Sequence, residues 1–135
     1  MEKERGQTIL TTMIMLYRKD GSFLVEDRKK QDWPGINFPG GHVEVNESIV
    51  EGAIRECQEE TGLIVDEIEE CGYFEWNLPS EKTRHLCLLF RSSSFHGEIH
   101  SSREGEVFFL SEKDLQGRQL STDFLDVLAK MKKGL

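Results

Sequence analysis

The chain has 135 residues, 37% apolar and 31% charged, a balance typical of one soluble globular domain spanning residues 1–135. Acidic residues outnumber basic residues 25 to 17, and the net charge of −8 disfavours a nucleic-acid polymer as partner. No apolar run is long enough to cross a bilayer, so we expect no membrane association.

The first predicted element is a buried strand over residues 8–17, which are apolar and β-branched. Basic residues precede it, as in a signal peptide, but no small-residue cleavage site follows, so we expect a cytoplasmic protein. Asp20-Gly21 is a turn signal, and residues 22–28 then alternate partly, which predicts a hairpin with the first strand. Trp33-Pro34-Gly35 and Pro39-Gly40-Gly41 indicate two loops.

Residues 46–61 change to a helical period, with Asn46 or Ser48 as N-cap and Gly62 as the stop signal. Strands are predicted over residues 64–77, 83–92 and 106–110, and a last helix begins at Ser121 or Thr122. This order predicts an α+β fold in which the two helices cover different faces of a sheet. The three cysteines include no C-x-x-C pair, which favours small buried side chains over a disulfide or zinc site.

The predicted helix carries Glu56, Glu59 and Glu60 at positions i, i+3 and i+4, so that the three carboxylates share one face. Arg55 points about 100° away around the helix and can pair with Glu51 or Glu59, which leaves at least two glutamates unpartnered. Either this is a solvated acidic face or the carboxylates bind a cation. Oxygen ligands suit Mg²⁺, Mn²⁺ or Ca²⁺ rather than zinc.

The stretch from Gly41 to Leu63 resembles the Nudix box, G-x5-E-x7-R-E-U-x-E-E-x-G-U, in which U is a bulky aliphatic residue. The fixed positions are matched by Gly41, Glu47, Arg55, Glu56, Glu59, Glu60, Gly62 and Leu63. The first U position departs from the pattern because it holds Cys57, which is small and usually buried. The resemblance implies the Nudix fold, an α/β/α sandwich with a mixed curved β-sheet.

The resemblance also implies roles for these residues, with Mg²⁺ as cofactor and Mn²⁺ as a substitute. Glu59 and Glu60 would be the main metal ligands, Glu56 a further ligand or the general base, and Arg55 would orient a glutamate of the box. The Gly40 carbonyl would complete the metal site, whereas Gly41, Glu47 and Gly62 would be structural. A later loop would add one carboxylate, for which Glu104 is the first choice, Glu106 the second and Glu44 a weaker one.

The reaction implied is metal-assisted attack of water on phosphorus in a small-molecule nucleotide, which makes the chain a nucleotide diphosphatase, or pyrophosphohydrolase. The approach to the box is similar to that of the MutT-type branch, so an 8-oxo-dGTP diphosphatase is the specific hypothesis. Trp33, Phe74 and Trp76 are candidates to stack on the base, against an ordinary packing role.

Three other functions remain open from the sequence. The first is hydrolysis of ADP-ribose, a dinucleoside polyphosphate or an RNA 5′ end, of which the RNA version fits the acidic charge least. The second is a nucleotide-sensing Nudix module without turnover, although the box keeps all its glutamates. The third, a Ca²⁺-binding protein, lacks EF-hand spacing. The oligomeric state is open, a homodimer included.

Overall fold

The computed structural model describes residues 4–135, and its larger sheet has four strands in the order β4-β1-β6-β5. These strands are β4 (Gly40–His42), β1 (Gln7–Leu16), β6 (Thr83–Gly97) and β5 (Leu63–Leu78). β1 and β6 run parallel, whereas β1–β4 and β5–β6 are antiparallel. The sheet is therefore mixed, as predicted.

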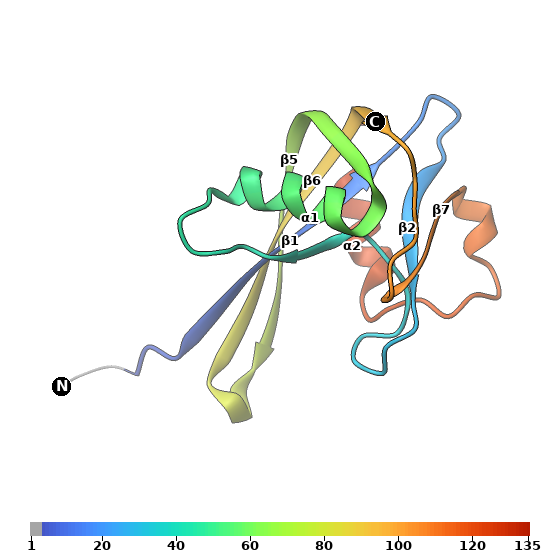
Figure 1. Cartoon of the computed structure of the whole chain (residues 1–135). Helices are drawn as coiled ribbons and strands as arrows, with labels where there is room; N and C mark the ends of the chain where they lie inside the picture. The colour runs from blue at the N-terminus through green and yellow to red at the C-terminus, as the bar shows by residue number, and fades with distance from the viewer. Residues whose placement is uncertain (1–3) are drawn as a thin grey trace.

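A second, antiparallel sheet of three strands stands beside the first (Figure 1). Its order is β3-β2-β7, with β3 spanning Gly35–Asn37, β2 spanning Phe23–Arg28 and β7 spanning Gly105–Leu110. Two short 3-10 helices, Pro79–Glu81 and Glu112–Leu115, complete the connections.

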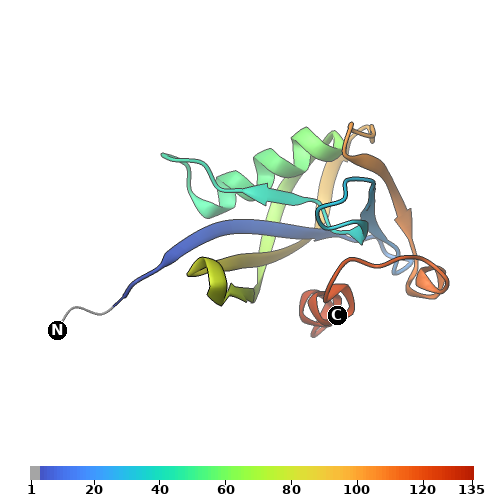
Figure 2. The same cartoon turned by 90° about the horizontal axis from the view of Figure 1, so that it is seen from below.

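The helices α1 (Ile49–Thr61) and α2 (Phe124–Lys132) cover opposite faces of the larger sheet, as Figure 2 shows on either side of β1. Alternation along β1 explains this arrangement. Ile14 and Leu16 are buried in the core cluster that includes the apolar side of α1, whereas Met15 is buried in the cluster that includes α2. The predicted α+β architecture is confirmed.

Helix α1 begins and ends at well-formed caps. The Ser48 hydroxyl accepts a hydrogen bond from the backbone N–H of Glu51, and the Glu51 carboxylate accepts one from the backbone N–H of Ser48. Of the two predicted N-caps, Ser48 is therefore the one used. At the other end Gly62 adopts a left-handed conformation with φ of 83°, which a residue with a Cβ rarely adopts.

The predicted hairpin between the first two strands is wrong. A turn does form, but the two strands meet only at one bridge, Tyr17 to Phe23, and then enter different sheets. β6 occupies one edge of β1 along its whole length, and β4 occupies part of the other edge, at Thr11–Met13. β2 pairs instead with β3 and β7 in the smaller sheet.

The loop predicted at Pro39-Gly40-Gly41 is also wrong in part, because Gly40–His42 forms the short strand β4. A Cβ placed on Gly40 would lie 1.9 Å from the carbonyl oxygen of Thr12, so only glycine permits this close pairing with β1.

The remaining boundaries differ little from the predictions. β6 continues to Gly97, and the last helix begins at Phe124. Cys57 and Cys87 are buried and Cys71 is partly exposed. Within residues 4–135 no helix is both long and apolar enough to span a membrane. The predicted domain starts at residue 1, which lies outside the described residues.

Candidate functional site

One set of glutamates, on α1 and in the segment before it, is held by a single arginine. Two nitrogens of Arg55 donate to the two carboxylate oxygens of Glu47, at 3.0 and 2.8 Å, and Nη2 also donates to the carbonyl of His42 at 3.0 Å. Its Nη1 donates to Glu56 at 2.9 Å and to Glu59 at 3.1 Å. We call Glu47, Arg55, Glu56 and Glu59 the arginine network.

The network corrects the expected partners of Arg55. The predicted i, i+4 pair with Glu59 is confirmed, but Glu51 is used in the N-terminal cap instead. From the sequence, at least two of the three helix glutamates were expected to lack a partner, but Arg55 also bonds to Glu56, which precedes Glu59 on the helix. The bonds from Arg55 hold the pKa of Glu47 down at about 2, and this glutamate anchors the segment before the helix.

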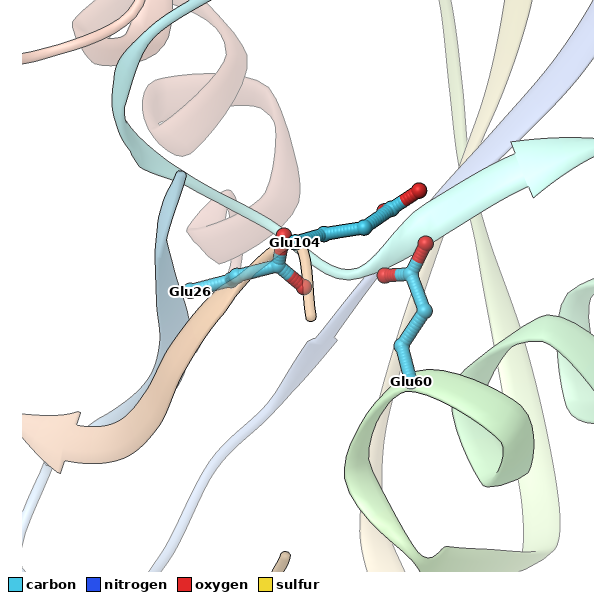
Figure 3. A group of neighbouring side chains, drawn as sticks. All are labelled: Glu26, Glu60 and Glu104. Atoms are coloured by element: carbon cyan, nitrogen blue, oxygen red, sulfur yellow. The ribbon is translucent and has the colours of Figure 1, made fainter. Parts of the chain in front are cut away.

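A second set of carboxylates converges from three separate elements (Figure 3). Glu26 comes from β2, Glu60 from the last turn of α1 and Glu104 from the segment before β7. One oxygen of each side chain lies within 4.8 Å of the others. We call these three residues the inner cluster.

Glu26 and Glu60 of the inner cluster are largely shielded from solvent and accept few hydrogen bonds. Glu26 is only 3% exposed, and its Oε2 has no hydrogen-bond partner among residues 4–135. Glu60 accepts one bond, from the backbone N–H of Gly40 at 3.2 Å. Burial, together with the neighbouring charge of Glu26, raises the pKa of Glu60 to about 9. Burial also raises the pKa of Glu26.

Within residues 4–135, the ion pairs of the inner cluster are those made by Glu104. Arg28 lies 3.3 Å from one of its oxygens and Lys30 lies 3.2 Å from the other. The other two candidates for the later carboxylate lie elsewhere. Glu106 is exposed on β7 opposite Asp27, and Glu44 is 67% exposed near Arg55.

The residues of the sequence prediction thus divide between two places. Glu60 and Glu104 lie in the inner cluster, with Gly40 bonded to Glu60, whereas Glu59 is 60% exposed and bonded to Arg55. Glu26 was missed altogether. The available signal was an acidic residue directly after the apolar run 23–25 of a strand, where a polar residue on a core-facing strand is unusual.

Glu56 belongs to the arginine network and lies against Gly41, which lines the cavity that the inner cluster opens into. A Cβ on Gly41 would lie 2.4 Å from its carboxyl carbon, so this glycine leaves the room that the Glu56 carboxylate occupies. Burial raises the pKa of Glu56, and this effect outweighs the opposing effect of Arg55.

The residues of the inner cluster fit a hard divalent cation. All the donors are oxygens, which suits Mg²⁺ or Mn²⁺, and one buried oxygen lacks any partner within the described chain. A buried carboxylate without a counter-charge is costly, and a cation removes that cost.

The inner cluster opens into a cavity of about 650 Å³, large enough for a nucleotide. Glu26, Glu60 and Gly40 are among the residues that line it, as are Trp33 and Trp76. The two indole rings meet edge to face with centroids 5.1 Å apart. Trp33 has a left-handed backbone, with φ of 66°, which is rare for so bulky a residue.

Of the three aromatic residues predicted to stack on a base, Phe74 is placed differently. Its ring contacts that of Trp76 at 4.7 Å and packs against the core cluster on the α2 side, and it is not among the residues that line the cavity. The Trp76 indole N–H donates to Asp123 at 2.8 Å, which fixes the ring at the cavity wall.

The chain is similar to known proteins both in sequence and in fold. A family model described as NUDIX domain matches residues 8–128. The RNA pyrophosphohydrolase of Stenotrophomonas maltophilia (strain K279a) is 36% identical over 75 residues, covering 53% of this chain and 35% of that protein. The match therefore spans about a third of that relative's length.

Two solved structures share the fold at low sequence identity. The MutT NUDIX hydrolase from Burkholderia pseudomallei is 18% identical with a TM-score of 0.80, covering 92% of this chain and 98% of that one. The NUDIX domain of Shewanella oneidensis NrtR, solved with ADP ribose, is 16% identical with a TM-score of 0.77, covering 94% and 87%. These likenesses confirm the predicted fold.

Proposed function

Because the chain belongs to the Nudix family, we propose that it is a hydrolase that cleaves the pyrophosphate linkage of a nucleotide with the help of Mg²⁺, for which Mn²⁺ can substitute. The observation that carries this proposal is the inner cluster. Three carboxylates converge there, and two of them, Glu26 and Glu60, line the same cavity as two indole rings. That combination suits a cation, a phosphate chain and a base.

Glu60 and Glu104 would hold the cation, with Glu56, Glu59 and the Gly40 carbonyl as the further donors that the family pattern implies. When bound, the cation would neutralise charge on the phosphate oxygens and lower the pKa of water. Arg55 holds the carboxylates of Glu56 and Glu59 in fixed positions through its bonds to both. This geometry supports a positioning role for Arg55.

We propose Glu56 as the general base. Its carboxylate lies against Gly41, which lines the cavity, and burial raises its pKa toward the range in which a base works well near neutral pH. Glu56 would accept the proton of the attacking water while the cavity walls hold the nucleotide. Glu47, already bonded to Arg55, would serve the structure rather than the chemistry.

The substrate we propose is a nucleoside triphosphate of the MutT type, cleaved to the monophosphate and pyrophosphate, with 8-oxo-dGTP as the specific candidate. Trp33 and Trp76 at the cavity wall support base stacking. ADP-ribose and dinucleoside polyphosphates remain alternatives of the same class.

An RNA 5′ end is a second candidate, favoured by one observation. A smaller hollow beside Asn77, which also lines the main cavity, carries Arg5, Lys82 and Arg84. Lys82 pairs with Glu4 and Arg84 with Glu75, so much of this positive charge is already offset. Together with the net charge of −8, this keeps RNA second to a free nucleotide.

The test is product release from a panel of canonical and 8-oxo triphosphates, ADP-ribose, a dinucleoside polyphosphate and a 5′-triphosphate RNA, with Mg²⁺ and with EDTA. The proposal expects pyrophosphate from one triphosphate class, only with metal. Turnover of ADP-ribose, the dinucleotide or the RNA alone would replace the substrate and keep the reaction class. Binding without turnover of any compound would instead indicate a nucleotide-sensing module.

A further inference from the structure

We infer that Glu26 is a further carboxylate ligand of the divalent cation, so that β2, α1 and the segment before β7 each contribute one oxygen donor. The inference rests on the proposed function, because it assigns a residue outside the Nudix pattern to the same metal site. Glu26 precedes the box and is not one of its fixed positions.

The first argument is the state of the Glu26 side chain. It is 3% exposed, and its Oε2 has no hydrogen-bond partner within residues 4–135. Buried carboxylate oxygens in folded proteins are normally paired, because water no longer solvates them. One oxygen of the same carboxylate lies in the inner cluster, within 4.8 Å of oxygens of Glu60 and Glu104 that are themselves metal-ligand candidates.

The second argument is that the basic side chains near Glu26 are bonded to other groups. Arg28 donates to Asp32 and Glu104, Lys30 donates to Glu104, and Lys29 donates to Asp27. These contacts offset the charge of Glu104 but leave Glu26 beside Glu60. Two neighbouring buried carboxylates repel each other, and a divalent cation that both ligate converts this repulsion into attraction.

The third argument is the direction of the side chains. Figure 3 shows Glu26 and Glu60 extending toward each other from a strand and a helix that belong to different layers. β2 lies in the smaller sheet, whereas α1 covers the larger one. A cation held by both residues would therefore tie the two sheets together, and metal binding would stabilise their relative placement.

The test measures binding of Mn²⁺ alone to the full chain by electron paramagnetic resonance, alongside thermal unfolding with and without the metal. The variants are Glu26→Gln, which keeps the shape of the side chain, and Glu26→Leu. Leucine is a common buried residue and has no atom that can ligate a metal. Asp27→Asn is the matched control, because Asp27 is the next residue on the strand and pairs with Lys29.

We expect both Glu26 variants to bind Mn²⁺ at least ~10-fold more weakly than the wild type, as loss of a carboxylate ligand requires. Their metal-free melting temperatures should rise, because a buried charge is gone, while the melting shift caused by Mn²⁺ shrinks. A residue with only a structural role would not produce these two opposite changes. Asp27→Asn should bind as the wild type does.

Wild-type affinity in both Glu26 variants would overturn the inference and leave the proposed function standing. An equal loss in Asp27→Asn would also overturn it, because the effect would then belong to the strand. A wild-type protein that binds no Mn²⁺ would contradict the metal-dependent reaction itself. Glu26→Leu is included because the amide oxygen of Glu26→Gln can still bind Mn²⁺, whereas leucine has no ligand atom.

Discussion

Two groups of glutamates lie close together at α1, and they differ in what neutralises them. In the arginine network, one guanidinium bonds to Glu47, Glu56 and Glu59. In the inner cluster, Glu26 and Glu60 face each other, and the ion pairs found among residues 4–135 are those of Glu104 with Arg28 and Lys30. The same residue type therefore has opposite electrostatic environments a short distance apart.

The carboxylates of the acidic helix therefore do not share one electrostatic environment. Where a guanidinium is supplied by the chain, the carboxylates are fixed and can position a reacting group. Where none is supplied, the structure leaves buried negative charge that a cation from solution can neutralise.

Removing one charge from the inner cluster should have the largest effect. Glu60→Gln should lower turnover by ~10³-fold while the fold stays intact, because a metal ligand supplies several kcal/mol of transition-state stabilisation. Steady-state kinetics at saturating Mg²⁺ with circular dichroism measures this. Glu70→Gln, an exposed change on β5, is the control and should leave turnover unchanged. A fully active Glu60→Gln variant would remove the inner cluster from the reaction.

Disrupting the arginine network should lower turnover less, because it displaces carboxylates without removing their charge. Arg55→Lys keeps the positive charge but cannot bond to both oxygens of Glu47 while also reaching Glu56. We expect turnover to fall by ~10²-fold and the melting temperature to drop by several degrees, with a smaller loss of Mn²⁺ affinity because Glu60 and Glu104 stay in place. If Mn²⁺ affinity falls as far as turnover does, Arg55 acts mainly through the cation and the contrast between the two groups of glutamates fails.

Substitutions at the two adjacent glycines should have different effects, one on the pairing of β4 with β1 and the other on the position of Glu56. Gly40→Ala would place a Cβ 1.9 Å from the backbone oxygen of Thr12, which cannot yield, so the melting temperature should fall strongly. Gly41→Ala meets the end of the flexible Glu56 side chain at 2.4 Å, so turnover should fall by ~10-fold with little loss of stability. Thermal unfolding and kinetics on both variants measure the difference, and equal melting temperatures would contradict it.

The pH dependence of the metal-free protein follows from the raised pKa of Glu60. Its folded pKa is about 9 against an ordinary value of 4.5, so the folded state holds a proton that the unfolded state has released. Stability from this group is present below pH 4.5 and is lost as the pH rises toward about 9. Urea unfolding in EDTA should show this slope, and Glu60→Gln should flatten it. A metal-free wild type that gains stability across this range would contradict the electrostatics described.

The smallest effect concerns the aromatic lining of the cavity. Trp33→Leu removes one of the two indoles that meet edge to face and leaves every carboxylate of both groups in place. We expect KM for a nucleotide to rise by ~10-fold with little change in kcat, as loss of one stacking partner predicts. A drop in kcat at unchanged KM would show that Trp33 acts on the chemistry rather than on binding.

Local patterns in the sequence accounted for the parts of the structure that depend on neighbouring residues. The spacing of Glu56, Glu59 and Glu60 predicted a shared helix face, and Ser48 and Gly62 marked its ends. The family pattern likewise pointed to the segment around Glu104 before its place in space was known.

Long-range packing accounts for what the sequence did not reveal. Glu26 and Glu60 meet only because β2 is displaced from β1 into a second sheet, and no local periodicity carries that information. The parallel pairing of β1 with β6 is equally non-local. The division between Glu59 and Glu60 depends on how the Arg55 side chain bends, which helical spacing alone does not fix.

The most direct test of the contrast is a crystal of the full chain soaked in Mn²⁺, with anomalous scattering used to locate the ion. We predict an anomalous peak between the carboxylates of Glu26, Glu60 and Glu104, and none inside the bonds from Arg55 to Glu47. A peak only beside the arginine network, with the inner cluster empty at saturating metal, would contradict the claim that the buried glutamates without a guanidinium form the cation site.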